Sequence, residues 1–438
     1  MRIESDKLGQ MEFSHKELYG LQTKRAYDNF NLNHKNTNLH LIYSIVKIKK
    51  AAATTYINIG ADKKGIYPLV ISACDRILAG EADEQFITQA LQGGAGTSTN
   101  MNVNEVIANL ALKALGHPFG SYDIIHPLDD VNRGQSTNDV YPTALRIAAI
   151  DTLRTLSNEC AKLQEALQKK ENELDSIKKV GRTELMDAIP ITLGGEFGAY
   201  AQAVARDRWR LYKVEERLRQ VNIGGTAIGT GTNADKQYRF GIIEVLRDLT
   251  GIGLAVSEYP LDITQNNDVF VEVSGLLKAL AVNLMKIAGD LRLMNSNALG
   301  EIQLKPMQLG STIMPGKVNP VIPEMVIQVA MRVMANDYAI TTASAHGEFE
   351  LNAFLPLIAD SLLESLELLV NSVKLFREKC VDLIEPNPLR CNALLNSSFT
   401  FATEYTTKLG YETVSRVMEQ YKDDPEKTKQ LLDEMINN

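Results

Sequence analysis

Long segments with apolar residues at helical spacing are the feature that most limits how this chain can fold. We expect helices over about 144–174, 192–220, 268–296 and 323–345, separated by short polar breaks. Helices of this length predict an elongated bundle whose apolar surface is too broad for one chain to bury, so self-association would cover it. A content of 45% hydrophobic but only 6% aromatic residues suits such a core of aliphatic side chains.

The two ends of the chain depart from this pattern. The first hundred residues carry short segments, with helices expected over 39–59 and 67–78, and from Pro386 the elements again become short. We therefore predict a mainly α fold with three domains. They are a mixed, mostly helical N-terminal domain, a central long-helix bundle and a short C-terminal helical domain, over residues 1–138, 139–385 and 386–438.

Composition excludes several kinds of protein. The four cysteines are scattered without CxxC spacing and the six histidines are dispersed, so we predict no disulfide framework, no metal site and no cofactor. A net charge of -8 argues against nucleic-acid binding. The sequence shows neither a signal peptide nor a membrane segment, and we expect a cytoplasmic protein.

Residues 310–320 form the candidate site with the clearest chemistry. Two glycines and two prolines forbid regular structure there, and the loop holds Ser311, Thr312, Lys317 and Asn319. A helix is expected to begin in the run 321–324, which places the loop at a helix N-terminus, where negative charge is stabilised. These groups favour an anion site; the alternative is a surface turn that happens to hold a lysine.

Two further stretches are rich in small polar residues. Residues 92–104 are expected to form a polar loop containing Thr97, before a helix over 105–115. Residues 126–143 are also polar, and Ser136, Thr137 and Asn138 would lie just ahead of the next helix. Capping of backbone N–H groups and binding of an anion are alternatives at these positions.

Four motifs together resemble the class II fumarase and aspartate ammonia-lyase family. They are Gly-Thr-Ser-Thr-Asn-Met-Asn-Val-Asn-Glu, Gly-Gln-Ser-Thr-Asn-Asp, Gly-Arg-Thr-Glu-Leu-Met-Asp-Ala and Gly-Ser-Thr-Ile-Met-Pro-Gly-Lys-Val-Asn-Pro, in the family's order and spacing. The resemblance implies a three-domain, mostly helical subunit and a homotetramer in which each active site takes loops from three subunits. It also implies elimination from a four-carbon dicarboxylate, with fumarate as the product.

The resemblance assigns roles to the polar residues. Ser311 matches the base that removes the Cβ proton, which is acidic enough only if preorganised donors hold the resulting aci-carboxylate. Lys317 matches a catalytic ligand of a substrate carboxylate. The remaining matches to substrate-binding positions are Thr97, Ser136, Thr137, Asn138, Thr183, Thr312 and Asn319.

The chain departs from the family pattern at two of these motifs. Glu184 stands where the family has His or Gln, and there the side chain approaches the leaving group and pairs with the acid matching Glu324. Two facing carboxylates would share a proton or attract a cation, which suits a substrate ammonium better than a leaving hydroxide. Leu128 stands where a second dicarboxylate site usually has Asn, so that site is not expected by analogy.

Smaller features favour aspartate deamination. Ser-Thr-Asn at 136–138 and Val-Ile-Pro-Glu at 321–324 resemble aspartate ammonia-lyases. The alternatives are a class II fumarate hydratase, a lyase of an N-substituted aspartate, and a non-catalytic binding or structural relative. The expected partners are a small dicarboxylate and further copies of the chain, with neither nucleic acid nor a membrane involved.

Overall fold

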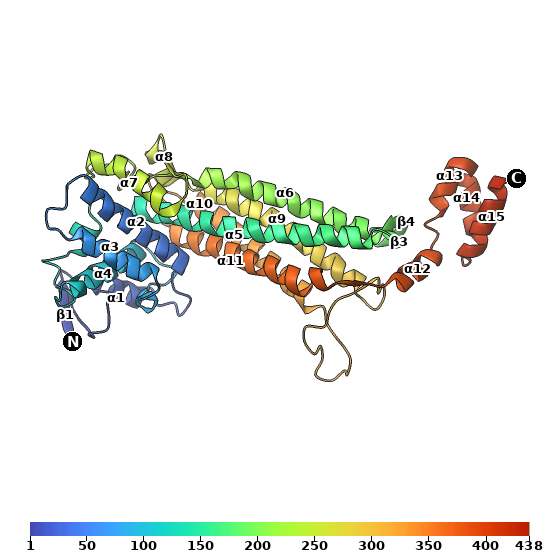
Figure 1. Cartoon of the computed structure of the whole chain (residues 1–438), viewed down its shortest axis with the longest axis horizontal. Helices are drawn as coiled ribbons and strands as arrows, with labels where there is room; N and C mark the ends of the chain where they lie inside the picture. The colour runs from blue at the N-terminus through green and yellow to red at the C-terminus, as the bar shows by residue number, and fades with distance from the viewer. Residues whose placement is uncertain (438) are drawn as a thin grey trace. The chain divides into compact units, whose positions relative to one another are not determined.

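The computed structural model describes residues 1–437, and Asn438, the last residue of the expected C-terminal domain, lies outside the described residues. Helices account for most of the chain, which confirms the mainly α fold (Figure 1). The described chain forms two compact units. Unit 1 comprises Met1–Thr155, Leu211–Lys278 and Val333–Glu367, and unit 2 comprises Leu156–Arg210, Ala279–Arg332 and Leu368–Asn438. The three-domain division at residues 138 and 385 stays a prediction.

Unit 1 contains the expected helices near the N-terminus. α2 (Leu39–Asn58) and α3 (Tyr67–Leu78) confirm the helices predicted over 39–59 and 67–78. α2 packs against α3 and against α7 (Lys236–Thr250), and α4 (Thr97–Ala114) packs against α3. Their buried faces supply a core of aliphatic and aromatic side chains, because apolar residues recur at helical spacing on each helix.

The polar loop expected over 92–104 is shorter than predicted. α4 begins at Thr97, eight residues before the expected start. Threonine and asparagine are weak helix formers, but their side chains here find buried partners: Asn102 donates to the Gln85 carbonyl at 3.0 Å, and the Thr99 hydroxyl accepts from Gln92 at 2.9 Å. Tertiary hydrogen bonds therefore outweigh local preference in this helix.

The helix expected from residue 144 also begins earlier. α5 (Thr137–Leu174) starts at Thr137 although Pro142 lies inside it. Proline has no N–H for the carbonyl four residues earlier, which is that of Asn138. The side-chain amide of Asn222 donates to this carbonyl at 2.9 Å instead. A partner distant in sequence thus satisfies the group that Pro142 leaves free.

Five long helices each pass from one unit into the other, and Figure 1 shows them running alongside one another. Four of them match the long helices expected from the sequence, whereas the fifth, over Leu355–Lys379, was not expected. Polar contacts join α6 to α9 within unit 2: Asn283 donates to Asp207 at 2.7 Å, and the Tyr200 hydroxyl donates to Asp290 at 2.9 Å. Their bounds are α5 as above, α6 (Leu193–Leu218), α9 (Asp268–Met294), α10 (Val321–Ala345) and α11 (Leu355–Lys379).

The strands in the described chain form short two-stranded sheets. β1 (Arg2–Asp6) pairs with β2 (Gly9–Phe13), β3 (Lys178–Thr183) with β4 (Met186–Thr192), and β7 (Ile302–Gln303) with β8 (Glu385–Pro386), all antiparallel. β5 (Gln220–Val221) and β6 (Ala255–Val256) are parallel. The remaining elements are α1 (Leu21–Asn29), the 3-10 turns Asp83–Gln85 and Val381–Leu383, a π-helical turn Pro127–Val131, and α8 (Pro260–Gln265).

The C-terminal part of unit 2 has short helices, as expected after Pro386. They are α12 (Pro388–Asn396), α13 (Ala402–Leu409), α14 (Tyr411–Gln420) and α15 (Pro425–Asn437). Tyr405, Val414 and Leu432 bring α13, α14 and α15 together around a small core of their own. Of the helices in residues 1–437, none combines the length and the apolar character that crossing a membrane requires.

Candidate active site

The loop over 310–320 lacks helix and strand, as predicted, and is closed at its base. The side-chain amide of Asn319 donates to the Gly310 carbonyl at 3.0 Å. A Cβ atom at Gly310 would lie 2.2 Å from the Lys317 carbonyl oxygen, so only glycine permits this approach. Between these ends the segment extends away from the flanking helices (Figure 1). Leu309, just before the loop, and Ile313 within it are 96% and 82% exposed.

Ser311 occupies a tight turn at the start of this loop. Its hydroxyl oxygen accepts hydrogen bonds from the backbone N–H groups of Ile313 at 3.2 Å and Met314 at 2.8 Å. Two N–H donors aimed at one oxygen stabilise negative charge on it, as in an oxyanion hole. Thr312 lies in the same turn and is exposed. The local fold therefore gives the Ser311 oxygen two backbone hydrogen-bond donors.

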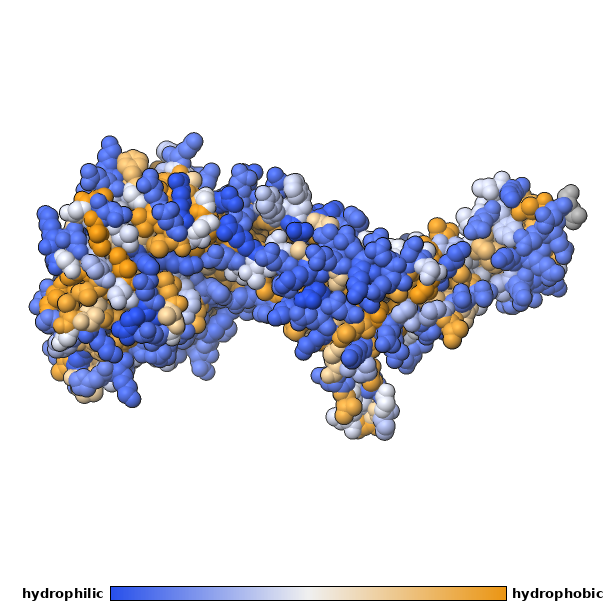
Figure 2. Space-filling model, in the orientation of Figure 1, coloured by the Kyte–Doolittle hydropathy of each residue, from blue (hydrophilic) through white to orange (hydrophobic). Residues whose placement is uncertain are grey.

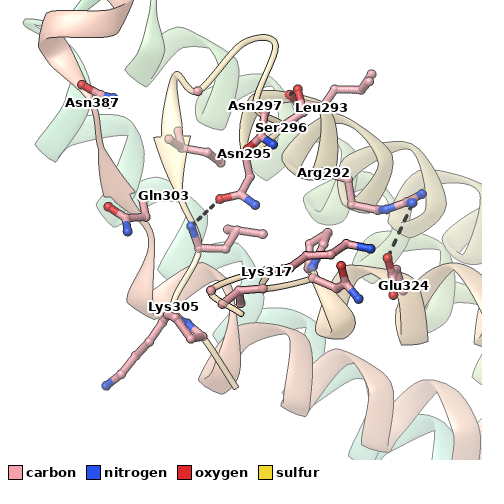
Figure 3. A pocket seen from close by; sticks show the side chains of 18 of the residues that line it. Arg292, Leu293, Asn295, Ser296, Asn297, Gln303, Lys305, Lys317, Glu324 and Asn387 are labelled. Carbon is pink, nitrogen blue, oxygen red and sulfur yellow. Dashed lines mark hydrogen bonds and ion pairs between the residues drawn. The ribbon is translucent and has the colours of Figure 1, made fainter. Parts of the chain in front are cut away.

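A cavity of about 930 Å³ opens beside the end of the loop. Lys317 and Asn319 line it together with Arg292, Lys305 and Glu324. Figure 3 shows Lys317, Arg292, Lys305 and Glu324 around it. Arg292 lies 3.7 Å from Glu324, whereas neither lysine has an ion-pair partner among the described residues. Three cations and one carboxylate give the cavity a positive balance, which favours an anionic ligand.

Arg292 and Lys305 were not predicted from the sequence to belong to a site. Arg292 lies in the last turn of α9, and Lys305 follows β7. Charged residues on long helices usually lie on solvated faces, so no spacing or motif marks Arg292 as part of a site. Its position becomes evident only when the end of α9 and the start of α10 lie side by side, as the Arg292–Glu324 pair shows.

Thr183 and Glu184 lie at the tip of the β3–β4 hairpin. Thr183 pairs with Met186, so the turn consists of Glu184 and Leu185. Both turn residues have positive φ, at 53° and 67°, which is usual for glycine or asparagine but unfavourable for glutamate and leucine. Strain of this kind is typical of functional positions. Glu184 is exposed at this tip.

Glu184 does not take the neighbouring arginine as its partner. Arg182 pairs with Glu301 at 2.7 Å and lies 3.4 Å from Asp187. Glu301 is completely buried and also contacts Lys179 at 3.2 Å. A buried carboxylate between two cations is well compensated and fixes the base of the hairpin to β7. No motif marks Glu301 in the sequence, because its cationic partners lie more than a hundred residues away.

The candidate residues of unit 1 lie at two helix N-termini. Thr97 is the first residue of α4, and Ser136 precedes α5. Asn138 donates its backbone N–H to the Ser136 hydroxyl at 3.2 Å and its side-chain amide to the Ala227 carbonyl at 2.7 Å. The Thr137 hydroxyl accepts from Asn100 at 3.0 Å. Ser136 thus caps the helix, and its hydroxyl proton is paired with no acceptor in residues 1–437.

Burial perturbs two charged groups next to these residues. Asp139 accepts from the backbone N–H of Ser136 at 3.0 Å, and burial raises its pKa to about 6. Lys49 is fully buried, and burial lowers its pKa to about 7. Neither group was identified from the sequence, where isolated charges on a helix are expected to face solvent.

The structure distributes the candidate residues over both units. Around the cavity of unit 2 it brings together three of them, Lys317, Asn319 and Glu324. Glu324 pairs there with Arg292, and no contact joins it to Glu184 in the described chain. No group of three or more His, Cys, Asp or Glu side chains within residues 1–437 is arranged to hold a metal ion. Unit 1 carries Thr97, Ser136, Thr137 and Asn138, and unit 2 carries Thr183, Glu184, Ser311, Thr312, Lys317, Asn319 and Glu324.

Comparisons with known proteins agree with the motifs. The family described as Lyase matches residues 9–335. An aspartate ammonia-lyase of Helicobacter pylori is 42% identical over 417 residues, which cover 94% of this chain and 89% of that protein.

Solved structures extend the agreement to the fold. A fumarate lyase:delta crystallin of Brucella melitensis has a TM-score of 0.92 at 41% identity and covers 99% of both chains. A class II fumarase of Schistosoma mansoni has a TM-score of 0.94 at 30% identity, with 99% of this chain and 95% of that chain covered. The chain therefore belongs to the fumarase/aspartase superfamily, and within it the chain is a carbon–nitrogen lyase.

Proposed function

We propose that this enzyme eliminates ammonia from L-aspartate to give fumarate. The observation that carries the proposal is that the Ser311 hydroxyl oxygen accepts hydrogen bonds from two backbone N–H groups, in a loop that also holds Lys317 and Asn319. Relatives named aspartate ammonia-lyase at about 42% identity support the same substrate.

The reaction begins with removal of the Cβ proton. Ser311, as the alkoxide, takes this proton, and the electron pair of the C–H bond moves into the adjacent carboxylate, which becomes an aci-carboxylate with two negative charges. The two N–H groups from Ile313 and Met314 lower the energy of the alkoxide before the transfer. Neutral donors at Thr97, Ser136, Thr137, Asn138, Thr183 and Thr312 suit a charge that grows during this step.

Collapse of the aci-carboxylate then breaks the Cα–N bond. The substrate ammonium leaves as neutral ammonia, so this departure needs no added proton. Lys317 and Asn319 hold a substrate carboxylate, and Glu184 supplies a counter-charge to the ammonium before it departs. A malate hydroxyl would instead need a proton donor, and a carboxylate at Glu184 does not provide one. Glu184 therefore favours an amino substrate over malate.

We further propose that the enzyme is a cytoplasmic homotetramer whose sites combine loops from three subunits. Exposed apolar side chains on the long helices support assembly, including Met331 and Tyr338 of α10 at 54% and 76% exposure. The four cysteines are all unpaired and buried, which supports a reducing compartment.

An absorbance assay tests the proposed reaction. The conjugated double bond of fumarate absorbs ultraviolet light, and we expect absorbance to rise when purified enzyme receives L-aspartate, with one ammonia released per fumarate. L-malate serves as the comparison substrate. A rise with malate alone would make the protein a fumarate hydratase, and no rise with either substrate would contradict the proposal.

A further inference from the structure

A fully buried lysine lies beneath the candidate substrate residues of unit 1. Lys49 belongs to α2, and its ammonium group donates to Asn132 Oδ1 at 2.7 Å and to Gln135 Oε1 at 3.0 Å. Both acceptors are side-chain amides in the segment that leads into α5. No carboxylate of the described chain forms an ion pair with Lys49. The buried carboxylate of Asp139 favours the charged form of Lys49 without forming an ion pair with it. A buried cation whose hydrogen bonds go only to neutral groups opposes folding, so its presence calls for another reason.

Asn132 connects this lysine to α4. Its side-chain oxygen also accepts from Asn100 Nδ2 at 3.1 Å and from Asn104 Nδ2 at 3.3 Å. Its own amide nitrogen donates to the Gln135 carbonyl at 3.2 Å. Because Asn100 and Asn104 lie on the helix that begins at Thr97, the cluster joins both polar motifs of unit 1.

Asn100 connects this cluster to Thr137. The same Asn100 nitrogen that donates to Asn132 donates its second hydrogen to the Thr137 hydroxyl oxygen at 3.0 Å. Thr137 is therefore a hydrogen-bond acceptor toward Asn100, which leaves its own proton free for another acceptor. No side chain or carbonyl within residues 1–437 accepts it. A ligand carboxylate is the acceptor that this orientation suits.

The cluster is poorly optimised for stability alone. Asn100 Oδ1 and Asn104 Oδ1 are buried, and neither accepts a hydrogen bond from the described residues. Unpaired buried acceptors beside a buried cation destabilise a fold, and natural proteins retain such groups mainly where function requires them. Aliphatic side chains of similar volume would pack there at lower cost.

We propose that Lys49 is a positioning residue that fixes Asn132 and Asn100 so that the Thr137 hydroxyl donates to a carboxylate of the substrate. Lys49 itself does not contact the substrate. Lys49 acts by holding the Asn132 side-chain oxygen in place, and this oxygen in turn orients the Asn100 amide that donates to Thr137. The inference rests on the proposed function to the extent that the ligand is a four-carbon dicarboxylate.

A double-mutant cycle on the full-length enzyme tests this role, with succinate as the dicarboxylate and calorimetry as the measurement. We expect Lys49→Met and Thr137→Val each to weaken succinate binding by about tenfold or more. In the Lys49→Met background, Thr137→Val should cost less than about threefold, because its hydroxyl is already misdirected. Lys50→Met is the matched control: Lys50 is the next residue on α2, pairs with Asp75 at 2.6 Å, and should leave the affinity unchanged.

Two results would overturn the role of Lys49. One is an equal cost of Thr137→Val in both backgrounds, which marks Lys49 as merely structural, and the other is wild-type affinity in Lys49→Met. If Lys49→Met does not assemble, Asn100→Leu removes the hydrogen bonds between Asn132 and Thr137 while Lys49 stays in place. The cost of Thr137→Val is then compared between wild type and the Asn100→Leu background.

Different results would contradict the proposed reaction and the proposed role of Lys49. Coupled succinate binding without ammonia release from aspartate would retain the role of Lys49 and overturn the proposed reaction. Ammonia release without coupling between the two residues would do the reverse. A wild-type enzyme that binds no succinate would contradict the positioning of a dicarboxylate by this cluster.

Discussion

At the scale of single residues, Ser311 is distinguished from other serines of the chain by its two backbone donors. Some serine hydroxyls at helix ends donate to a nearby carbonyl, as Ser397 does to the Leu394 carbonyl at 3.1 Å, and others accept from one backbone N–H group, as Ser136 does from Asn138 at 3.2 Å. Ser311 accepts from two backbone N–H groups, those of Ile313 and Met314, and two donors to one oxygen suit negative charge on it. These two donors support the role of base that we propose for Ser311, whereas Ser397 lies at the end of a helix.

Replacing Ser311 by alanine should abolish elimination without disturbing assembly. We expect Ser311→Ala to lower kcat by about four orders of magnitude, because the proton acceptor is lost while the exposed N–H groups can turn to water. Steady-state kinetics with aspartate measures the loss, and light scattering confirms assembly. Ser397→Ala is the matched control and should retain full activity. A Ser311→Ala enzyme with a tenth of wild-type activity would contradict the assignment of the base.

Glu184 should determine the choice of leaving group. Glu184→Gln removes the counter-charge for the ammonium, and we expect kcat/KM for aspartate to fall by about tenfold or more. Glu184→His should raise any activity on malate. Asp187→Asn is the control, because Asp187 belongs to the same hairpin but lies beside Arg182. If the aspartate-to-malate ratio of kcat/KM changes by less than about threefold across wild type and both Glu184 variants, Glu184 plays no part in substrate choice.

At the scale of secondary-structure elements, the start of α4 depends on one close contact. Gly96 has a φ of 93°, and a Cβ atom there would lie 2.2 Å from the ring of Tyr141 on α5. Glycine is needed twice over at this position, for the left-handed backbone and for the space. Thr97 follows directly, so the orientation of a candidate substrate residue depends on how closely the two helix starts approach each other.

Gly96→Ala should therefore destabilise the fold more than an alanine at another left-handed glycine. We expect a loss of about 2–4 kcal/mol, from backbone strain together with overlap with Tyr141. Gly116→Ala is the matched control at the other end of α4, because Gly116 has a φ of 76° and no atom lies within 4 Å of the position that its Cβ would take. It should cost only about 1 kcal/mol. Denaturant unfolding measures the stability of both variants. Equal losses of unfolding free energy would show that Tyr141 accommodates the added atom.

The elements also show how far the sequence can predict this protein. Apolar spacing located α2, α3, α6, α9, α10 and most of α5, because burial of one helix face leaves a regular pattern, but α11 was not predicted. It placed the starts of α4 and α5 too late, since these turns are held by side-chain partners distant in sequence, such as Asn222. Motifs identified the candidate site residues, but Arg292, Glu301 and Lys49 carry no local signal, because their partners become neighbours only after folding.

At the scale of the whole molecule, hydrophobic surface interrupts an otherwise hydrophilic exterior (Figure 2). Large apolar side chains remain exposed on α9 and α10, among them Val282, Leu293, Met331 and Tyr338. Single exposed residues of this kind are ordinary, but their recurrence on helices that pass through both units favours association with further copies of the chain. Assembly of this kind would also allow candidate residues of unit 1 and unit 2 to meet across different chains.

Mixing two impaired variants tests this shared site. Thr137→Val impairs a residue of unit 1 and Ser311→Ala a residue of unit 2, so neither pure enzyme should turn over aspartate efficiently. If each site takes Thr137 and Ser311 from different chains, random mixing in equal amounts leaves about a quarter of the sites with both residues intact, and about a quarter of wild-type activity should return.

The mixture distinguishes sites shared between chains from sites formed within a single chain. Every chain in it carries one of the two substitutions, so sites built within single chains could never contain both intact residues. Co-expression of the variants with different affinity tags, followed by purification through both tags, isolates the mixed assemblies, and separately purified variants mixed without subunit exchange are the control. Activity no higher than that control would show that Thr137 and Ser311 act within one chain, and a monomer with full activity would contradict the tetramer itself.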